Sequence, residues 1–226
     1  DNDRLNKIQG VCGIIQREVQ RFEGYLKEVT VDDKGFVAVM GFGVPPYAHD
    51  DDPVRGVQCA LAMDQLLHSE RVEGRAFGIT TGDVFCGSIG NERRAEYGMV
   101  GSKVVLAARL MVAALKGDKS RGSIIVDADT YSAASEQIPF EIDSNGQDHM
   151  EPSKVKGREE PVETYRPRKE ESVFRKKTSN KKLPEPHHRG GGNELGSGGS
   201  KGSIDYDANN DDHHQPQAAA AAAARG

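Results

Sequence analysis

Residues 76–111 read AFGITTGDVFCGSIGNERRAEYGMVGSKVVLAARLM, and this stretch decides the fold. It begins with two β-rich runs, Ala76 to Thr81 and Val84 to Ile89, which are separated by the turn-forming pair Gly82-Asp83. It then enters a helical segment, Ser102 to Lys116, which is almost entirely apolar. Two strands followed by a buried helix predict a domain that mixes a sheet with helices.

The same alternation of helices and strands extends on both sides of this stretch. Apolar residues at helical spacing predict helices, and short β-rich runs next to Gly and Asp predict strands and hairpins. Interleaved hairpins and helices predict an α+β sandwich, in which helices cover one face of a mostly antiparallel sheet. The expected helices are 5–22, 53–67, 102–116 and a short one from Asp129; further expected strands are 26–31, 36–42, 123–126, one near Phe140 and 162–165.

Composition excludes several classes of protein. The chain has 226 residues and a formal net charge of −5, which argues against a nucleic-acid binder that relies on bulk electrostatics. No run of 18 apolar residues is present, so we expect no transmembrane segment. The N-terminus does not have the pattern of a signal peptide, and three widely spaced cysteines favour a reducing compartment; we therefore expect a cytoplasmic protein.

The composition changes sharply after Pro167. Residues 168–226 contain a basic block, a Gly/Ser-rich stretch and a run of alanines, with only five Val, Ile, Leu or Phe residues. The burial of only five apolar side chains cannot offset the entropy that is lost when the segment becomes ordered. The sequence therefore predicts a disordered tail. The alanine run is too short to hold a helix alone. The expected folded domain is therefore residues 1–167.

Arg109 is the most unusual residue of the third expected helix. It stands in the otherwise apolar run from Val104 to Met111. A guanidinium rarely stays unpaired against a core, so Arg109 either pairs with a carboxylate or faces a cleft that accepts an anion. Spacing alone favours the structural salt bridge, because such pairs are commoner than catalytic arginines.

Three ordered motifs resemble class III nucleotidyl cyclases, most of all the second catalytic half of soluble, bicarbonate-responsive-type adenylyl cyclases. Phe77 to Gly90 resembles the central hairpin of that family, and Glu96 to Arg109 resembles the segment that leads into its catalytic helix. Lys156 to Tyr165 is similar to the closing strand. The resemblance runs from about Gln9 to Pro167. It implies a ferredoxin-like sandwich, which here is N-terminally truncated because the family's first strand is missing.

The resemblance also implies a composite active site. In this family two halves pack head to tail and form nucleotide sites at their interface. One half supplies two aspartates that hold two metal ions, Mg²⁺ or Mn²⁺. The other supplies base-selecting residues, an Asn for the ribose and an Arg for the phosphate. The chemistry is attack of the ribose 3′-oxygen on the α-phosphorus, which turns ATP into cyclic AMP and pyrophosphate.

Five residues of this chain fall at the family's nucleotide positions. The resemblance makes Arg109 the catalytic arginine, and places Lys34 either against the base or in a solvated turn. Gly98 stands at the base-selecting position without a side chain, and Met99 beside it could pack on a purine ring. Val105 stands where the family has its ribose-binding Asn, and its side chain cannot hydrogen-bond. The resemblance assigns no metal ligand to this chain, so the partner half would hold most of the metal.

Two classes of function therefore remain open. The first is half of a composite cyclase, an enzyme that is active only when paired with a metal-binding half or a second copy, with ATP as substrate. The second is a catalytically inactive dimerisation or regulatory module with the same fold. Arg109 and Lys34 favour the enzyme, whereas Val105 and Gly98 favour the inactive module. Gly98 excludes neither base, so a guanylate cyclase is a further alternative.

Overall fold

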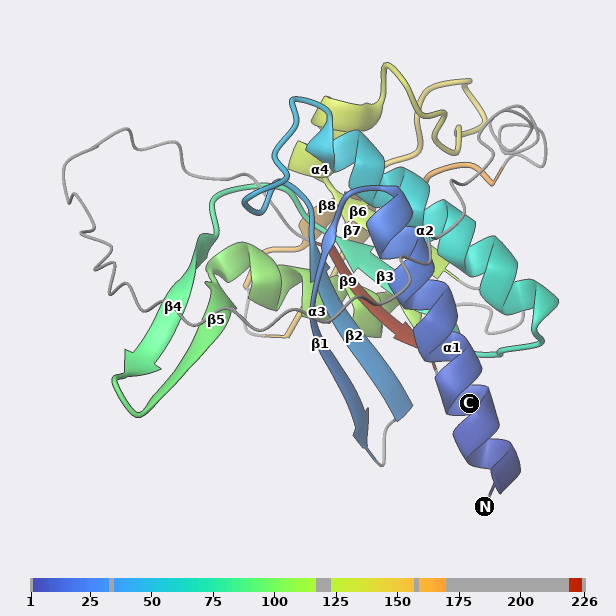
Figure 1. The fold of residues 1–226 in the computed structure, drawn as a ribbon. Coiled ribbons are helices and arrows are strands. Elements are labelled where there is room, and N and C mark those ends of the chain that lie inside the picture. The colour runs from blue at the N-terminus through green and yellow to red at the C-terminus, as the bar shows by residue number, and fades with distance from the viewer. Residues whose placement is uncertain (1, 33–34, 117–122, 157–158, 170–219, 225–226) are drawn as a thin grey trace, which may run out of the picture. The chain divides into compact units, whose positions relative to one another are not determined.

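The computed structural model describes residues 2–32, 35–116, 123–156, 159–169 and 220–224, all of which belong to one compact unit. It contains helices and two sheets, which Figure 1 labels in chain order. The helices are α1 (Asn2–Arg21), α2 (Asp52–Ser69), α3 (Ser102–Ala114) and α4 (Ala128–Ala134). The strands are β1 (Tyr25–Asp32), β2 (Gly35–Gly41), β3 (Ala76–Ile79), β4 (Phe85–Asn91), β5 (Arg94–Val100), β6 (Ser123–Asp127), β7 (Glu151–Ser153), β8 (Val162–Tyr165) and β9 (Ala220–Ala224).

The larger sheet has the strand order β1-β2-β9-β3-β6-β8-β7. The β3–β6 pair is parallel, and the other pairs of this sheet are antiparallel. A separate two-stranded antiparallel sheet consists of β4 and β5. The α+β class with a mostly antiparallel sheet, expected from the sequence, is confirmed.

The helices cover both faces of the large sheet, whereas the sequence predicted helices on one face. Alternate residues of strand β6 lie on opposite faces of the sheet. Ile124 and Val126 lie in the core cluster that includes residues of α1 and α2. Ile125, between them, lies in a second cluster built with α3. The physical reason is the parallel β3–β6 pair, because parallel neighbours require a crossover connection. Helix α3 lies in that connection and packs against β3 and β6.

The expected pairing of residues 76–81 with residues 84–89 is not formed. Strand β3 lies inside the large sheet, where β9 and β6 occupy both of its edges. Strand β4 pairs instead with β5, which the sequence did not predict, in a register that runs from Phe85 opposite Val100 to Asn91 opposite Arg94. The Asn91 side chain closes the turn by accepting hydrogen bonds from the backbone N–H groups of Arg93 and Arg94.

The C-terminal residues also differ from the expected disordered tail of residues 168–226. Residues Ala220–Ala224 form β9 between β2 and β3, where both neighbouring strands offer backbone hydrogen-bonding groups. The Arg168 backbone N–H donates to the Pro139 carbonyl at 2.8 Å, so the described domain continues past Pro167. Residues 170–219 lie outside the described residues.

Gly78 is the point of closest approach between α3 and the sheet. A Cβ built on Gly78 would collide with the backbone of α3, at the Ala107 carbonyl oxygen and the Met111 nitrogen. Because both obstacles belong to the backbone, no side-chain rotation can relieve the collision. Glycine at position 78 therefore sets how closely α3 packs on β3.

We predict that Gly78→Ala lowers the free energy of unfolding by about 3 kcal/mol, because α3 must move away from the sheet. The matched control is Gly13→Ala in α1, where a Cβ meets nothing within 4 Å. That substitution should raise stability by about 0.5–1 kcal/mol through helix propensity. Urea unfolding followed by circular dichroism measures both, and equal effects would contradict the close approach.

Candidate functional site

Helix α3 has two chemically different faces. Its sheet-facing side is buried and apolar, with Leu106, Ala107, Leu110, Met111 and Ala114. Its other side consists of four residues at the spacing i, i+3, i+4 and i+7, and residues at this spacing share one face of a helix. On it Val105 and Val112 are each 50% exposed, Ala108 is exposed, and Arg109 is half-buried.

Arg109 makes no salt bridge within the described residues, although spacing favoured one. In that part of the chain no carboxylate lies within 4 Å of its guanidinium, and its side chain makes no hydrogen bond. A charged group in this position is available to an anion. Val105 lies one turn earlier on the same face, so the structure brings these two predicted site residues together.

Gly98 and Met99 lie next to one another on β5 but point to opposite faces of the hairpin. The Met99 side chain is only 4% exposed and packs in a small core cluster with Val44 and Val84. Gly98 faces the other way, and the Ile89 side chain occupies the space that a Cβ of Gly98 would need. The structure therefore covers both predicted base-contacting residues with side chains, and Lys34 lies outside the described residues.

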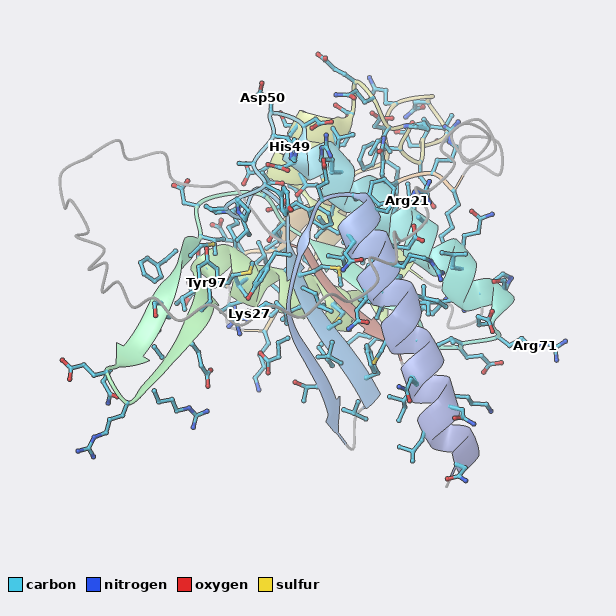
Figure 2. All side chains as sticks on the ribbon, viewed as in Figure 1. Arg21, Lys27, His49, Asp50, Arg71 and Tyr97 are labelled. Atoms are coloured by element: carbon cyan, nitrogen blue, oxygen red, sulfur yellow. The ribbon has the colours of Figure 1, made fainter. Side chains whose placement is uncertain are left out.

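The face of the β4–β5 hairpin that carries Gly98 presents exposed apolar side chains, with the exposed ion pair of Arg94 and Glu96 near the turn. Phe85 and Val100 are directly opposite each other and are 61% and 56% exposed, and Ile89 is 46% exposed. On the hairpin's other face, Met99 is buried, and the Tyr97 ring meets the Tyr25 ring edge to face at 5.6 Å. Tyr97 is labelled in Figure 2. The uncovered apolar face is a candidate surface for a partner.

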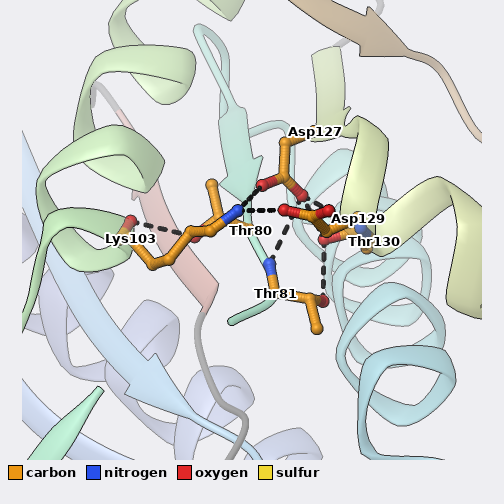
Figure 3. Close-up of polar contacts among 6 residues, drawn as sticks. All are labelled: Thr80, Thr81, Lys103, Asp127, Asp129 and Thr130. Carbon is orange, nitrogen blue, oxygen red and sulfur yellow. Dashed lines mark hydrogen bonds and ion pairs between the residues drawn. The ribbon is translucent and has the colours of Figure 1, made fainter. Parts of the chain in front are cut away.

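A partly buried polar cluster lies at the start of α3 (Figure 3). The Lys103 ammonium contacts the carboxylates of Asp127, at 2.8 Å, and Asp129. Asp127 is almost fully buried, and its Oδ1 accepts hydrogen bonds from the backbone N–H groups of Thr81 and Thr130 and from the Thr130 hydroxyl. The cluster therefore joins the ends of β3 and β6 to the first turns of α3 and α4.

The pKa of Lys103 lies above the ordinary lysine value. Burial lowers the pKa, but hydrogen bonds to Asp127 and Asp129 outweigh that effect. A hollow of about 660 Å³ opens beside the ammonium, with the acidic residues of the cluster and Glu159, Glu160 and Glu163 in its lining. This cluster could not be predicted from the sequence, because its only local signal was the Asp-x-x-Thr capping pattern at residues 127–130.

The acidic run before α2 forms a structural loop. The His49 backbone N–H donates to Asp52 at 2.7 Å, and the His49 ring lies 3.1 Å from Glu23 (Figure 2). Arg55 pairs with Asp51 and with Glu23, each at 2.7 Å. Throughout residues 2–169, apart from the gaps given above, no three His, Cys, Asp or Glu side chains are grouped so that they could hold a metal ion.

Sequence comparison relates the chain to adenylate cyclase type 10. The human protein is 30% identical over 140 residues, which is 60% of this chain and 8% of that protein. The rabbit protein (Oryctolagus cuniculus) is 29% identical over 129 residues, or 57% of this chain and 8% of that protein. The chain thus spans about 8% of the length of these curated relatives. No protein-family profile matches the chain.

Solved structures of cyclase domains share the fold. The adenylyl cyclase CyaB from P. aeruginosa superimposes with a TM-score of 0.58 at 22% identity, over 74% of this chain and 83% of that one. The guanylyl cyclase Cya2 gives 0.56 at 22% identity, over 77% and 85%. The guanylate cyclase domain of RhGC from Catenaria anguillulae, in complex with GTP, gives 0.56 at 19% identity, over 74% and 85%.

Among the described helices, none has the length and apolar character needed to cross a bilayer.

We predict that Lys103→Met lowers the free energy of unfolding by about 2–3 kcal/mol, because it leaves the buried Asp127 carboxylate without its cation. The control is Arg94→Met, which removes an ion pair to Glu96 whose side chains are 85% and 70% exposed. The control should change stability by less than about 1 kcal/mol. Similar losses in both variants would contradict a structural role for the cluster.

The stability difference between wild type and Lys103→Met should also depend on pH. Because the pKa of Lys103 is raised in the folded state, its stabilisation is fully present below the ordinary lysine pKa of about 10.4. It is lost as the pH rises through the raised folded value. The stability difference between wild type and Lys103→Met should therefore be constant near neutral pH and shrink only in strongly alkaline buffer. A difference that disappears already at neutral pH would contradict this assignment.

Proposed function

We propose that this chain, a class III cyclase catalytic domain in sequence and fold, forms one half of a composite cyclase that converts ATP to cyclic AMP and pyrophosphate in the cytoplasm. The observation that supports this most directly is Arg109. It is a half-buried guanidinium without a carboxylate partner in the described residues, on the exposed face of α3. A purely structural arginine in a helix this apolar would have a counter-charge within the chain.

In the proposed reaction Arg109 acts on the phosphate. The ribose 3′-oxygen forms a bond to the α-phosphorus while the bond from that phosphorus to the pyrophosphate oxygen breaks. Negative charge on the non-bridging oxygens and on the leaving group must be stabilised as this happens. A guanidinium fixed on a helix supplies such stabilisation at little reorganisation cost, because the packing of α3 already holds it in place.

The partner in this proposal is a second cyclase half or a second copy of the chain. Two exposed apolar surfaces support it: the hairpin face with Phe85, Ile89 and Val100, and the α3 face with Val105 and Val112. Apolar surfaces of this kind on a folded domain mark sites of association. A half that packs against them would bring its nucleotide-binding groups toward Arg109.

The proposal assigns the metal to the partner half. Class III cyclases use Mg²⁺ or Mn²⁺, and the described residues of this chain do not offer a cluster that fits either ion. The base pocket would involve Lys34 and Met99, with Gly98 at the position that selects the base, and binding would have to displace the side chains that cover Met99 and Gly98. Relatedness to adenylate cyclase type 10 favours ATP, and GTP is the alternative because Gly98 presents no selective side chain.

An inactive dimerisation or regulatory module is the second candidate, and Val105 supports it. Its side chain is exposed on the same face as Arg109 and is apolar where the family places an Asn for the ribose. Without that hydrogen bond the ribose is less well oriented for in-line attack. The cover over Gly98 and the burial of Met99 also favour the inactive module, because a base would have to displace Ile89 or bind the backbone.

The deciding experiment measures cyclic AMP and cyclic GMP made by this chain mixed with a class III half that carries both metal-binding aspartates, in manganese buffer. We predict product from the mixture and none from the chain alone. Arg109→Ala should lower the rate about 100-fold, because a transition-state charge contact is lost. The control is Arg71→Ala, an exposed arginine beyond the end of α2 and away from α3 (Figure 2).

Each outcome separates the candidates. Equal rates for wild type and Arg109→Ala, with association intact in sedimentation, would mean that the chemistry uses other residues. Association without product would support the inactive module. Robust product from the chain alone would contradict the composite architecture.

We further predict that Val105→Asn raises turnover of the mixture about 10-fold or more, because an amide on this face of α3 can hydrogen-bond and orient a ribose. Val112→Asn is the matched control, because Val112 is equally exposed on the same helix face but lies two turns further along. Unchanged turnover in Val105→Asn would show that position 105 does not face the substrate.

A further inference from the structure

Two glycines face each other across the β4–β5 hairpin. Gly87 lies directly opposite Gly98, and on its own strand it stands between Phe85 and Ile89. Because neither glycine has a side chain, the side chains of their neighbours reach the space above them. A Cβ built on Gly98 would lie 2.3 Å from the Ile89 Cδ1 atom. The Ile89 side chain therefore closes over the Gly98 backbone.

This cover over Gly98 is a single exposed side chain. Gly98 is buried, whereas Ile89 above it is 46% exposed. Ile89 belongs to none of the apolar core clusters of the described residues. Its branched side chain has a few discrete rotamers, so it can leave Gly98 by rotation of the side chain alone. The cover can therefore open and close while the hairpin stays intact.

We propose that Ile89 controls the access of a purine base to the nucleotide site. This inference rests on the proposed function, in which Gly98 stands at the position that selects the base. In the closed rotamer the Ile89 side chain fills the space that the base would enter, and a base binds only after that side chain has turned away. The chain by itself is thus held in a closed form of low affinity.

The chemistry around this space also determines how the two purines are treated. Adenine and guanine differ at one ring position, where adenine has an amino donor and guanine has a carbonyl acceptor. Ile89, Gly87 and Gly98 have no side-chain donor or acceptor that could distinguish them. Opening of the cover should therefore favour ATP and GTP by the same factor. Ile89 acts on the access of the base and not on the choice between bases.

The first test measures nucleotide affinity in the complex of this chain with a class III half that carries both metal-binding aspartates. The probes are the α,β-methylene analogues of ATP and GTP, which cannot be cyclised, titrated by calorimetry in manganese buffer. With the open rotamer at about a tenth of the population, Ile89→Ala should lower the dissociation constant of both probes about 10-fold. Ile89→Val deletes only the methyl group nearest Gly98 and should lower both about 3-fold.

Phe85→Ala is the matched control. Phe85 is an exposed apolar residue on the same face of the same strand, but its ring lies over Gly87 and not over Gly98. Both alanine variants remove apolar surface from the hairpin, so both are expected to weaken association with the other half. Sedimentation identifies concentrations at which each complex is fully formed. There Phe85→Ala should leave both dissociation constants within about 2-fold of the wild type.

The second test observes the cover directly by methyl nuclear magnetic resonance. The chain alone should show a nuclear Overhauser contact between the Ile89 δ1 methyl group and the Gly98 α protons. This contact should disappear in the complex saturated with the ATP analogue. Absence of the contact in the chain alone, or its persistence in the saturated complex, would overturn the proposal.

The remaining outcomes separate the role of Ile89 from the proposed function. Unchanged affinity in both Ile89 variants, in a complex that makes cyclic nucleotide, would overturn the role of Ile89 and leave the proposed function standing. Tighter binding in Ile89→Ala without any product from ATP or GTP would support the role of Ile89 and contradict the proposed activity. Complexes that bind neither probe, with the wild type or with either variant, would overturn both.

Discussion

The buried carboxylate of Asp127 is the contact on which the arrangement of α3 depends. It stands at the end of β6, accepts hydrogen bonds from Thr81 at the end of β3 and from Thr130 in α4, and pairs with Lys103 in α3. A charge this deeply buried is tolerable only when all of these partners are present. The strand ends and the two helices therefore have one mutually compatible position. The position of Arg109, six residues beyond Lys103 on the same helix, follows from it.

Much of the fold could be predicted from the sequence, because the signals are local. Apolar spacing located α1, α2 and α3, and the β1–β2 hairpin followed from two β-rich runs around a turn containing Gly35. The partners of β4 and β9 could not be predicted in this way. Which edges of β3 are free depends on β6 and β9, which come later in the chain, and no pattern within residues 76–89 contains that information.

For the candidate site, too, local features could be predicted from the sequence and tertiary contacts could not. Arg109 and Val105 share a face because they are four residues apart on a helix, which the sequence states directly. The absence of a carboxylate near Arg109 within the described residues, the burial of Met99 and the cover over Gly98 depend on tertiary packing. The Lys103–Asp127 pair joins residues 24 positions apart, and only the fold brings them together. Class and fold could therefore be predicted, whereas the competence of the site could not.

The stability of the β4–β5 hairpin depends on what contacts its exposed side chains. An isolated two-stranded sheet is only marginally stable in water, and this one buries Gly98 and Met99 but leaves most of its side chains in solvent, including Phe85, Ile89 and Val100. In the proposed association, a partner half that binds only the ordered hairpin would draw the equilibrium toward order by mass action. Order in this arm would then depend on the concentration of that partner as well as on the sequence of the hairpin.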